Sequence, residues 1–177
     1  MAITILAAVL LAGAGIMILG FVLAQKEEYR KAEVIFKTEK GEAKFLAEVA
    51  DNTFKRTRGL SGKENLGEKE GMLFVYSIAG KPGFWMKDMN FAIDIVWIKG
   101  EEVVGVTKEV KPESYKEGKV FYPPTKKVGE TGPPVSEKVG ETGLSEAVDK
   151  ILEIKAGEAE KNNIKEGDKV EVVFGNF

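Results

Sequence analysis

Cysteine and histidine are both absent from the 177 residues of the sequence, and several chemistries are absent with them. Without cysteine the chain can form neither a disulfide framework nor a thiolate nucleophile. Without either residue it has no Cys/His zinc site, and without histidine it has no Ser-His-Asp triad. The sequence also lacks glycine-rich phosphate loops and acidic calcium loops of standard spacing. We therefore predict neither a cofactor nor a metal site.

An excess of one charge is lacking as well. The chain holds 26 Lys and Arg residues against 28 Asp and Glu residues, and its formal net charge is −2. A nucleic-acid-binding domain needs an unbalanced basic face, so we predict no nucleic-acid partner. The charged fraction of 31%, together with the missing cysteine, is typical of proteins from hot environments.

The first 24 positions contain no charged residue, whereas the next seven contain five. As a helix, this segment would be about 36 Å long, enough to cross hydrocarbon about 30 Å thick. We predict an N-terminal transmembrane anchor or signal segment over residues 1–25, which makes the membrane a partner, and a charged link over 26–32. A signal peptide cleaved after Val22-Leu23-Ala24 and a buried core helix are the alternatives. The basic link favours a cytoplasmic domain by the positive-inside rule, but a single span leaves an exported domain open.

Residues 33–177 have the size of one domain. Alternating apolar and polar residues predict strands at Val34–Lys37 and Lys44–Val49, on either side of a turn at 39–42. Further short strands are predicted at 72–76, 84–86, 93–98 and 103–107, and alternation predicts a last one at 169–174.

Few helices are expected. Asn52 and its neighbours can cap a helix over 54–58 that Gly59 would end, and others are predicted at 157–162 and after Ser145. The fold class predicted is mostly β (α+β): a small antiparallel barrel-like or curled sheet with two or three short helices.

A segment rich in proline and glycine interrupts this domain at 123–143. The hexapeptide Lys-Val-Gly-Glu-Thr-Gly occurs there at 127–132 and again at 138–143. Two copies cannot build a solenoid, so we predict a flexible loop. One structural alternative for the whole protein is a scaffold that docks a partner protein through this loop.

Candidate binding residues gather between residues 54 and 98. If residues 84–88 form a strand, Trp85 and Lys87 share one face and offer a stacking surface beside a cation. Such a surface suits a sugar or an anionic small molecule. The alternative places Trp85 in the core, with Lys87 extending to water.

Asp94 lies within an apolar strand, between Ile93 and Ile95. A buried carboxylate must be neutralised by a cation or by several hydrogen-bond donors. We predict that Arg56 or Arg58 pairs with Asp94, either as a purely structural ion pair or beneath a ligand site. The predicted ligand-binding residues are Arg56, Arg58, Trp85, Lys87, Asn90 and Asp94.

Several motifs in order resemble one known family, domain of unknown function 192. They are Arg58-Gly59-Leu60, Gly71 to Phe74, Phe84 to Lys87, Asp94-Ile95, Leu152 to Gly157 and Ile164 to Asp168. The resemblance covers roughly residues 34–174. It implies a compact, mostly β domain that is often exported and whose activity is not established, and it therefore favours an extracytoplasmic domain here.

The function predicted is a membrane-anchored, non-catalytic binding or accessory module for a small molecule or carbohydrate. One alternative is a hydrolase of cell-envelope carbohydrate that uses Asp88 and Asp94 as its carboxylate pair. The scaffold that docks a protein through residues 123–143 is the other alternative.

Overall fold

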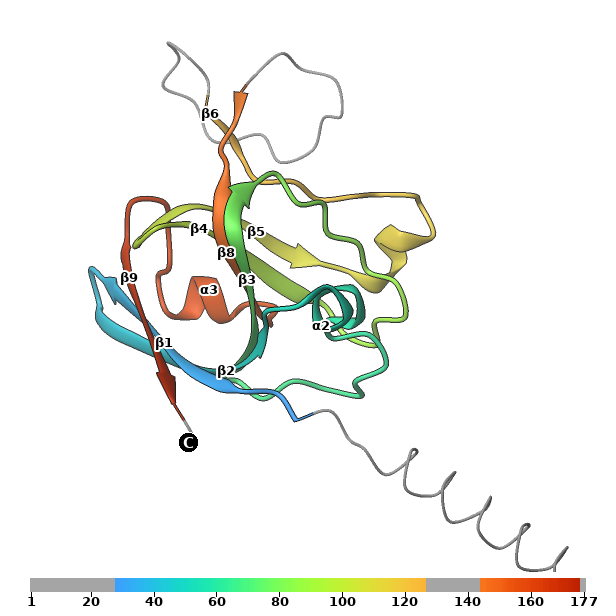
Figure 1. The fold of residues 1–177 in the computed structure, drawn as a ribbon, viewed down its shortest axis with the longest axis horizontal. Helices are drawn as coiled ribbons and strands as arrows, with labels where there is room; N and C mark the ends of the chain where they lie inside the picture. The colour runs from blue at the N-terminus through green and yellow to red at the C-terminus, as the bar shows by residue number, and fades with distance from the viewer. Residues whose placement is uncertain (1–27, 127–143, 176–177) are drawn as a thin grey trace, which may run out of the picture.

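The computed structural model describes residues 28–126 and 144–175, in which seven strands close into a barrel (Figure 1). In chain order these strands are β1 (Lys31–Thr38), β2 (Gly41–Ala50), β3 (Glu70–Gly80), β4 (Ile93–Lys99), β5 (Glu102–Val110), β8 (Val148–Lys155) and β9 (Lys169–Gly175). Around the barrel the order is β1-β2-β3-β8-β4-β5-β9, and β9 pairs with β1 to close it. The mostly β fold is confirmed.

One pairing departs from the antiparallel sheet that the sequence predicts. β2 and β3 run parallel, whereas every other pair in the barrel is antiparallel. Parallel neighbours need a crossover connection, and residues 51–69 supply it. That connection carries the helix α2 (Thr53–Arg58) and lies against the outside of the barrel. The barrel is therefore mixed, and its single crossover brings α2 beside β3.

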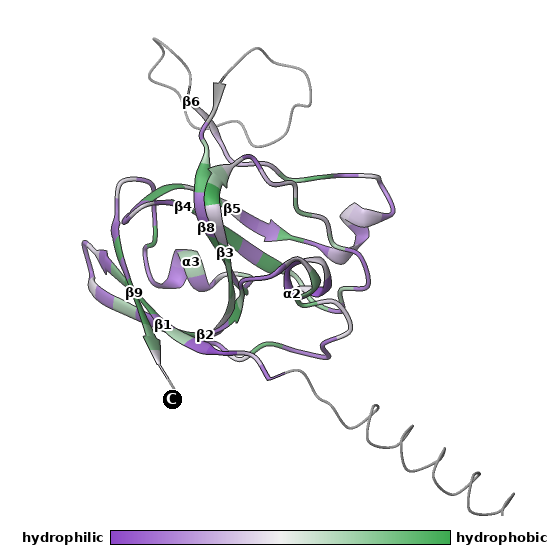
Figure 2. Cartoon of the chain, in the orientation of Figure 1, coloured by the Kyte–Doolittle hydropathy of each residue, from purple (hydrophilic) through white to green (hydrophobic). Residues whose placement is uncertain are grey.

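The apolar residues form two cores, one on each side of the barrel wall. Alternate residues of β4 divide between them: Val96 and Ile98 belong to the cluster inside the barrel, and Ile95 and Trp97 to a cluster outside it. All four side chains are buried, so β4 is covered on both faces. Figure 2 shows the corresponding strongly hydrophobic stretches on β3, β4 and β8. The outer core lies beneath α2 and the loops around it.

The predicted short helices are partly correct. α2 and α3 (Glu158–Lys161) lie where the sequence predicts helices, and the turn Pro112–Tyr115 is a 3-10 helix. The predicted helix after Ser145 is wrong. The chain there forms β7 (Leu144–Ser145), which pairs with β6 (Thr125–Lys126), and then enters β8. Apolar residues in β8 fill both cores, and this burial outweighs the helix-capping preference of one serine.

Two predicted segments fall wholly or mostly outside the described residues. One is the N-terminal anchor over 1–25. The other is the loop at 123–143 with its duplicated hexapeptide, and the strands β6 and β7 on either side of the hexapeptide copies are described. Among residues 28–126 and 144–175, no helix combines the length and the apolar character that crossing a bilayer requires.

Candidate functional site

A cavity of about 230 Å³ opens between α2, the end of β3 and the loop that follows β3. Its wall combines cations, hydroxyl groups, aromatic rings and one carboxyl group. The residues that line it are Thr53, Arg56, Thr57, Arg58, Gly59, Leu60, Ser61, Phe74, Tyr76, Gly83, Phe84, Trp85, Met89 and Glu153. We call this space the α2 cavity.

The position of α2 follows from its two ends. The Asn52 side chain accepts a hydrogen bond from the backbone N–H of Lys55 at 2.8 Å and so caps the first turn. At the other end Gly59 adopts a φ of +51°, which favours glycine, and a Cβ there would lie 3.3 Å from the Phe74 ring. The helix therefore ends in close contact with β3, and this contact places Arg56 and Arg58 at the cavity.

Arg56 is fixed by backbone oxygens. Its Nη1 donates to the carbonyl oxygens of Asp51 at 2.9 Å and Val75 at 3.0 Å, and its guanidinium lies over the Tyr76 ring at 4.8 Å. The Val75 carbonyl is accessible because the β3–β8 register breaks after Val75. Arg56 thus ties α2 to β3, and it is also one of the residues that line the cavity.

Arg58 is the more available cation. Its side chain is exposed, and within residues 28–126 and 144–175 no acidic side chain pairs with it. A guanidinium with free N–H groups beside a cavity can bind a carboxylate or phosphate through two parallel hydrogen bonds.

Trp85 presents a ring to the same cavity. It is 49% exposed, whereas its neighbours Phe84 and Met86 are buried. The segment is not a strand but a loop held at Phe84, which exchanges two backbone hydrogen bonds of 2.8 Å with Phe121. Alternation around that anchor still directs Trp85 outward. The alternative that placed Trp85 in the core is wrong.

Glu153 forms the floor of the cavity. It comes from the middle of β8, opposite Met72 on β3 and Ile95 on β4, and only 5% of its surface is exposed. Burial raises the pKa of its carboxyl group to about 8. Among the described residues the side chain has no hydrogen-bonding partner, yet none of the fully buried polar side-chain atoms there lacks one. Its carboxyl oxygens must therefore reach the cavity.

Asp94 lies on the other side of the barrel wall, away from both arginines. Its Oδ1 accepts from the backbone N–H of Glu109 at 2.8 Å, and its Oδ2 accepts from the N–H groups of Gly157 and Ala159 at 3.0 Å each. The predicted pairing of Asp94 with Arg56 or Arg58 is therefore wrong. Three backbone donors satisfy this fully buried carboxylate and cap α3 from a neighbouring strand.

The same burial bears on the predicted carboxylate pair. Asp94 is 0% exposed and lies in the barrel interior, and the α2 cavity is lined by neither Asp88 nor Asp94. A glycosidase needs both carboxyl groups at an open cleft. These two residues do not form such a site.

A second cavity, of about 260 Å³, lies beside β5 and the 3-10 helix. Three lysines and three glutamates line it together with Thr107, Val110, Ser114 and Phe121. Because its charges balance, this second cavity selects for neither anions nor cations.

A family model for DUF192, described as "Uncharacterized ACR", matches residues 34–172. The chain belongs to the DUF192 family. No curated protein matches the sequence of this DUF192 chain.

Two solved structures share the fold of this DUF192 domain. One is a putative transcription regulator from Sinorhizobium meliloti 1021, with a TM-score of 0.64 and 20% identity, covering 83% of this chain and 97% of that one. The other is a protein of unknown function from Novosphingobium aromaticivorans DSM 12444, with a TM-score of 0.62 and 24% identity, covering 83% and 89%. At these identities the likeness establishes the fold alone.

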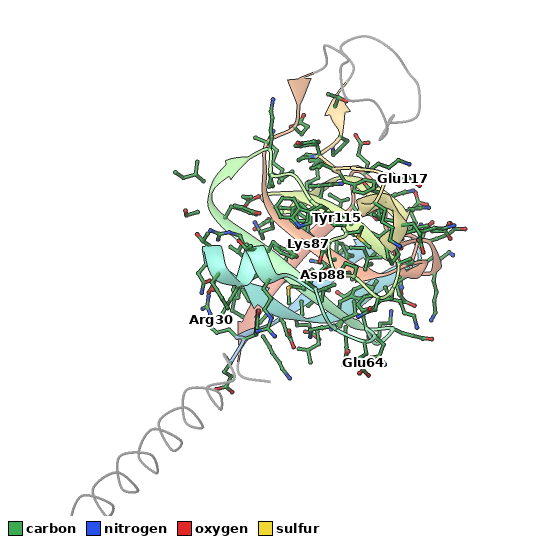
Figure 3. The ribbon with its side chains drawn as sticks, turned by 90° about the vertical axis from the view of Figure 1, so that its right-hand side faces the viewer. Arg30, Glu64, Lys87, Asp88, Tyr115 and Glu117 are labelled. Carbon is green, nitrogen blue, oxygen red and sulfur yellow. The ribbon has the colours of Figure 1, made fainter. Side chains whose placement is uncertain are left out.

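The DUF192 domain brings together half of the predicted binding residues. Arg56, Arg58 and Trp85 line the α2 cavity, whereas Lys87 and Asn90 do not. Figure 3 shows Lys87 and Asp88 on the face of the barrel turned toward the viewer. The Asn90 amide donates to the Lys63 carbonyl at 2.8 Å, and the Lys87 carbonyl accepts from Ser61 Oγ at 2.8 Å. Both positions thus hold the loop that carries Trp85.

Sequence analysis missed Glu153. This residue lies between Leu152 and Ile154, just as Asp94 lies between Ile93 and Ile95. A carboxylate in an apolar strand was therefore a signal at both positions, but it was used at only one.

Proposed function

We propose that this DUF192 protein is a non-catalytic binding module for a small molecule that carries a ring and an anionic group. The α2 cavity is its site. The observation that carries the proposal is the pairing of a half-exposed indole, Trp85, with an exposed and unpaired guanidinium, Arg58, on the wall of one cavity of about 230 Å³. Within residues 28–126 and 144–175, no acidic side chain pairs with Arg58.

The two groups bind in complementary ways. The face of an indole takes the apolar face of a ring, and the guanidinium takes a carboxylate or a phosphate group. The hydroxyl groups of Thr53, Thr57 and Ser61 add further hydrogen-bonding positions to the wall. Arg56 adds positive charge but uses part of its guanidinium to hold α2.

We also propose that residues 1–25 tether this module to a membrane, with the domain on the extracytoplasmic side. The length of the uncharged segment supports the tether. Protease accessibility of the domain in sealed cells tests the side.

The binding proposal is tested by tryptophan fluorescence of the full-length chain. The sequence has two tryptophans, and Trp97 is buried and bonded to Thr107 Oγ1 at 2.9 Å, so the change on binding should come from Trp85. The probes are benzoate and D-glucuronate as anionic ring compounds, D-glucose as a neutral one and benzylamine as a cationic one, all at fixed ionic strength.

We expect saturable binding of at least one anionic ring compound, and no binding of benzylamine. Arg58→Ala should weaken the binding of that anion by about tenfold or more, since hydrogen bonds to charged groups contribute about 1.5–3 kcal/mol. The matched control is Arg30→Ala. It removes the same charge from a residue that pairs with Asp51 outside the cavity. Equal effects of the two variants, or no binding of either anion, would overturn the proposal.

A further inference from the structure

We infer that Glu153 contacts the inner end of the ligand, exchanging a hydrogen bond with a ring hydroxyl group, and that the ligand class is therefore a sugar acid. This inference rests on the proposed binding function and specifies its ligand. Glu153 is the acidic residue among those that line the α2 cavity.

The carboxyl group of Glu153 is available to a ligand in the cavity. Only 5% of the surface of Glu153 is exposed, and its side chain has no hydrogen-bonding partner among the described residues. An isolated buried carboxyl group destabilises a fold unless something satisfies it. In the barrel interior, three backbone donors satisfy Asp94, but none of the backbone donors described in the structure reaches Glu153. A ligand group in the α2 cavity would complete this site.

The protonation state of Glu153 narrows the choice of that group. Because burial raises its pKa to about 8, the side chain is mainly a neutral carboxylic acid at pH 7. A neutral carboxylic acid both donates and accepts a hydrogen bond, and a hydroxyl group does the same. An amine would ionise Glu153 and pair with it, but its positive charge would lie in a cavity that already holds Arg56 and Arg58. The charge balance favours the hydroxyl group.

The remaining walls complete the description of the ligand. Trp85 suits the C–H face of a sugar ring, and Arg58 suits a carboxylate at the open side. A volume of about 230 Å³ is below the usual range of roughly 300–1,000 Å³ for drug-sized ligands, so a single ring fits and a chain of rings does not. A monosaccharide with one carboxylate combines all of these features.

The test compares three probes that separate the features of the ligand. D-glucuronate has the ring, the hydroxyl groups and the carboxylate, benzoate lacks the hydroxyl groups, and D-glucose lacks the carboxylate. Binding of each probe to the full-length wild type, Glu153→Leu and Glu153→Gln is measured by calorimetry at pH 6, where Glu153 is protonated.

D-glucuronate should bind wild type about tenfold more tightly than either other probe. Glu153→Leu should weaken D-glucuronate by about tenfold and leave benzoate within about twofold, because only D-glucuronate loses a hydrogen bond. Glu153→Gln keeps a donor and an acceptor at the same length of side chain, and should restore most of the lost D-glucuronate affinity. Thermal unfolding confirms that each variant is folded.

Two results would overturn the inference while leaving the binding function intact. One is benzoate binding as tightly as D-glucuronate, and the other is an equal loss of both probes in Glu153→Leu. Failure of both anions to bind wild type would instead remove the proposed function, and the inference with it. If Glu153→Leu does not fold, Glu153→Met takes its place, since methionine also lacks the O–H donor of the carboxylic acid. Weaker D-glucuronate binding with benzoate unchanged then supports the inference, and unchanged D-glucuronate binding or an equal loss of both probes overturns it.

Discussion

Asp94 and Glu153 are buried acids on the adjacent strands β4 and β8, where Ile95 lies opposite Glu153 and Asp94 opposite Ile154. Their side chains point to opposite sides of the barrel wall. Asp94 points inward and accepts three backbone hydrogen bonds, whereas Glu153 points outward to a cavity and has no hydrogen-bonding partner in the described part of the chain. Burial raises the pKa of both groups, and only Asp94 has backbone donors that oppose this effect. The comparison separates a carboxylate that the fold needs from one that the fold merely tolerates.

The largest effect should come from truncating the first of these acids. Asp94→Ala would leave the N–H groups of Glu109, Gly157 and Ala159 without acceptors in a buried setting. We expect the free energy of unfolding, measured by urea denaturation, to fall by roughly 3 kcal/mol or more. Asp94→Asn is the matched variant, since its amide oxygen can keep the two bonds to Gly157 and Ala159, and should lose about half as much. A loss below about 1 kcal/mol in the alanine variant would contradict the capping role.

The second acid should respond in the opposite direction. Glu153→Leu removes from the edge of an apolar core a carboxyl group whose ionisation burial disfavours, so it should increase the free energy of unfolding at pH 8–9 by a few kcal/mol, on the order implied by the raised pKa. The measurement is the same urea titration. Destabilisation comparable to that of Asp94→Ala would show that Glu153 has a structural partner and would remove the contrast between the two acids.

The pH dependence of stability gives an intermediate effect with a defined sign. The pKa of Glu153 is about 8 in the folded chain and near the ordinary 4.5 in the unfolded one, so the folded state holds the extra proton between these values. The folded state is therefore most stable, as far as Glu153 is concerned, below pH 4.5, where the carboxyl group is protonated in both states. This stability is lost as the pH rises through about 8. Tyr76 and Arg56, which also line the cavity, are common to wild type and variant.

Urea titrations at five pH values between 5 and 9 measure this effect as the difference between wild type and Glu153→Leu. The advantage of the leucine variant should grow steadily as the pH rises and level off above pH 8. The raised pKa of Asp94 acts in the same direction in both proteins and cancels in the difference. A difference that does not change with pH would show that Glu153 ionises normally in the folded chain.

The sequence predicts the local strand pairings of this barrel better than its long-range one. The hairpins β1–β2 and β4–β5 and the cap of α2 at Asn52 follow from local patterns, because alternation and turn chemistry are local properties. The parallel β2–β3 pair does not follow from them. It depends on where a crossover of some twenty residues places the chain, and no local pattern records that position.

The candidate site shows the same limit. Alternation along residues 84–86 predicts that Trp85 is exposed if Phe84 and Met86 on either side of it are buried, as they are. The partners of Asp94 do not follow from such a pattern, since backbone N–H groups exist at every non-proline residue and carry no sequence signal. The sequence therefore suggests arginines as partners of the Asp94 carboxylate, whereas the actual donors are backbone N–H groups. Glu153 was visible, but its significance depends on a cavity formed by segments far apart in the chain.

The smallest effect concerns the backbone that serves Asp94. Glu109 adopts a φ of +52°, in the left-handed region, and from there it donates its N–H to Asp94 Oδ1. Glycine adopts this conformation without strain, whereas a residue with a Cβ loses roughly 1–2 kcal/mol. Glu109→Gly should therefore be more stable than Glu109→Ala by about 0.5–1 kcal/mol, after the greater freedom of glycine in the unfolded chain is subtracted. Glu109→Ala controls for removal of the exposed carboxylate.

Repeating this pair of variants in the Asp94→Ala background links the strain to the acid. If the Asp94 carboxylate holds residue 109 in the left-handed region, its removal frees the backbone to relax, and the stability difference between glycine and alanine should shrink toward zero. If the difference is unchanged, the turn itself imposes the conformation, and Asp94 only accepts a hydrogen bond that the fold already offers. Either result measures how much of the β4–β5 geometry is organised around Asp94, a role for which Glu153 has no counterpart.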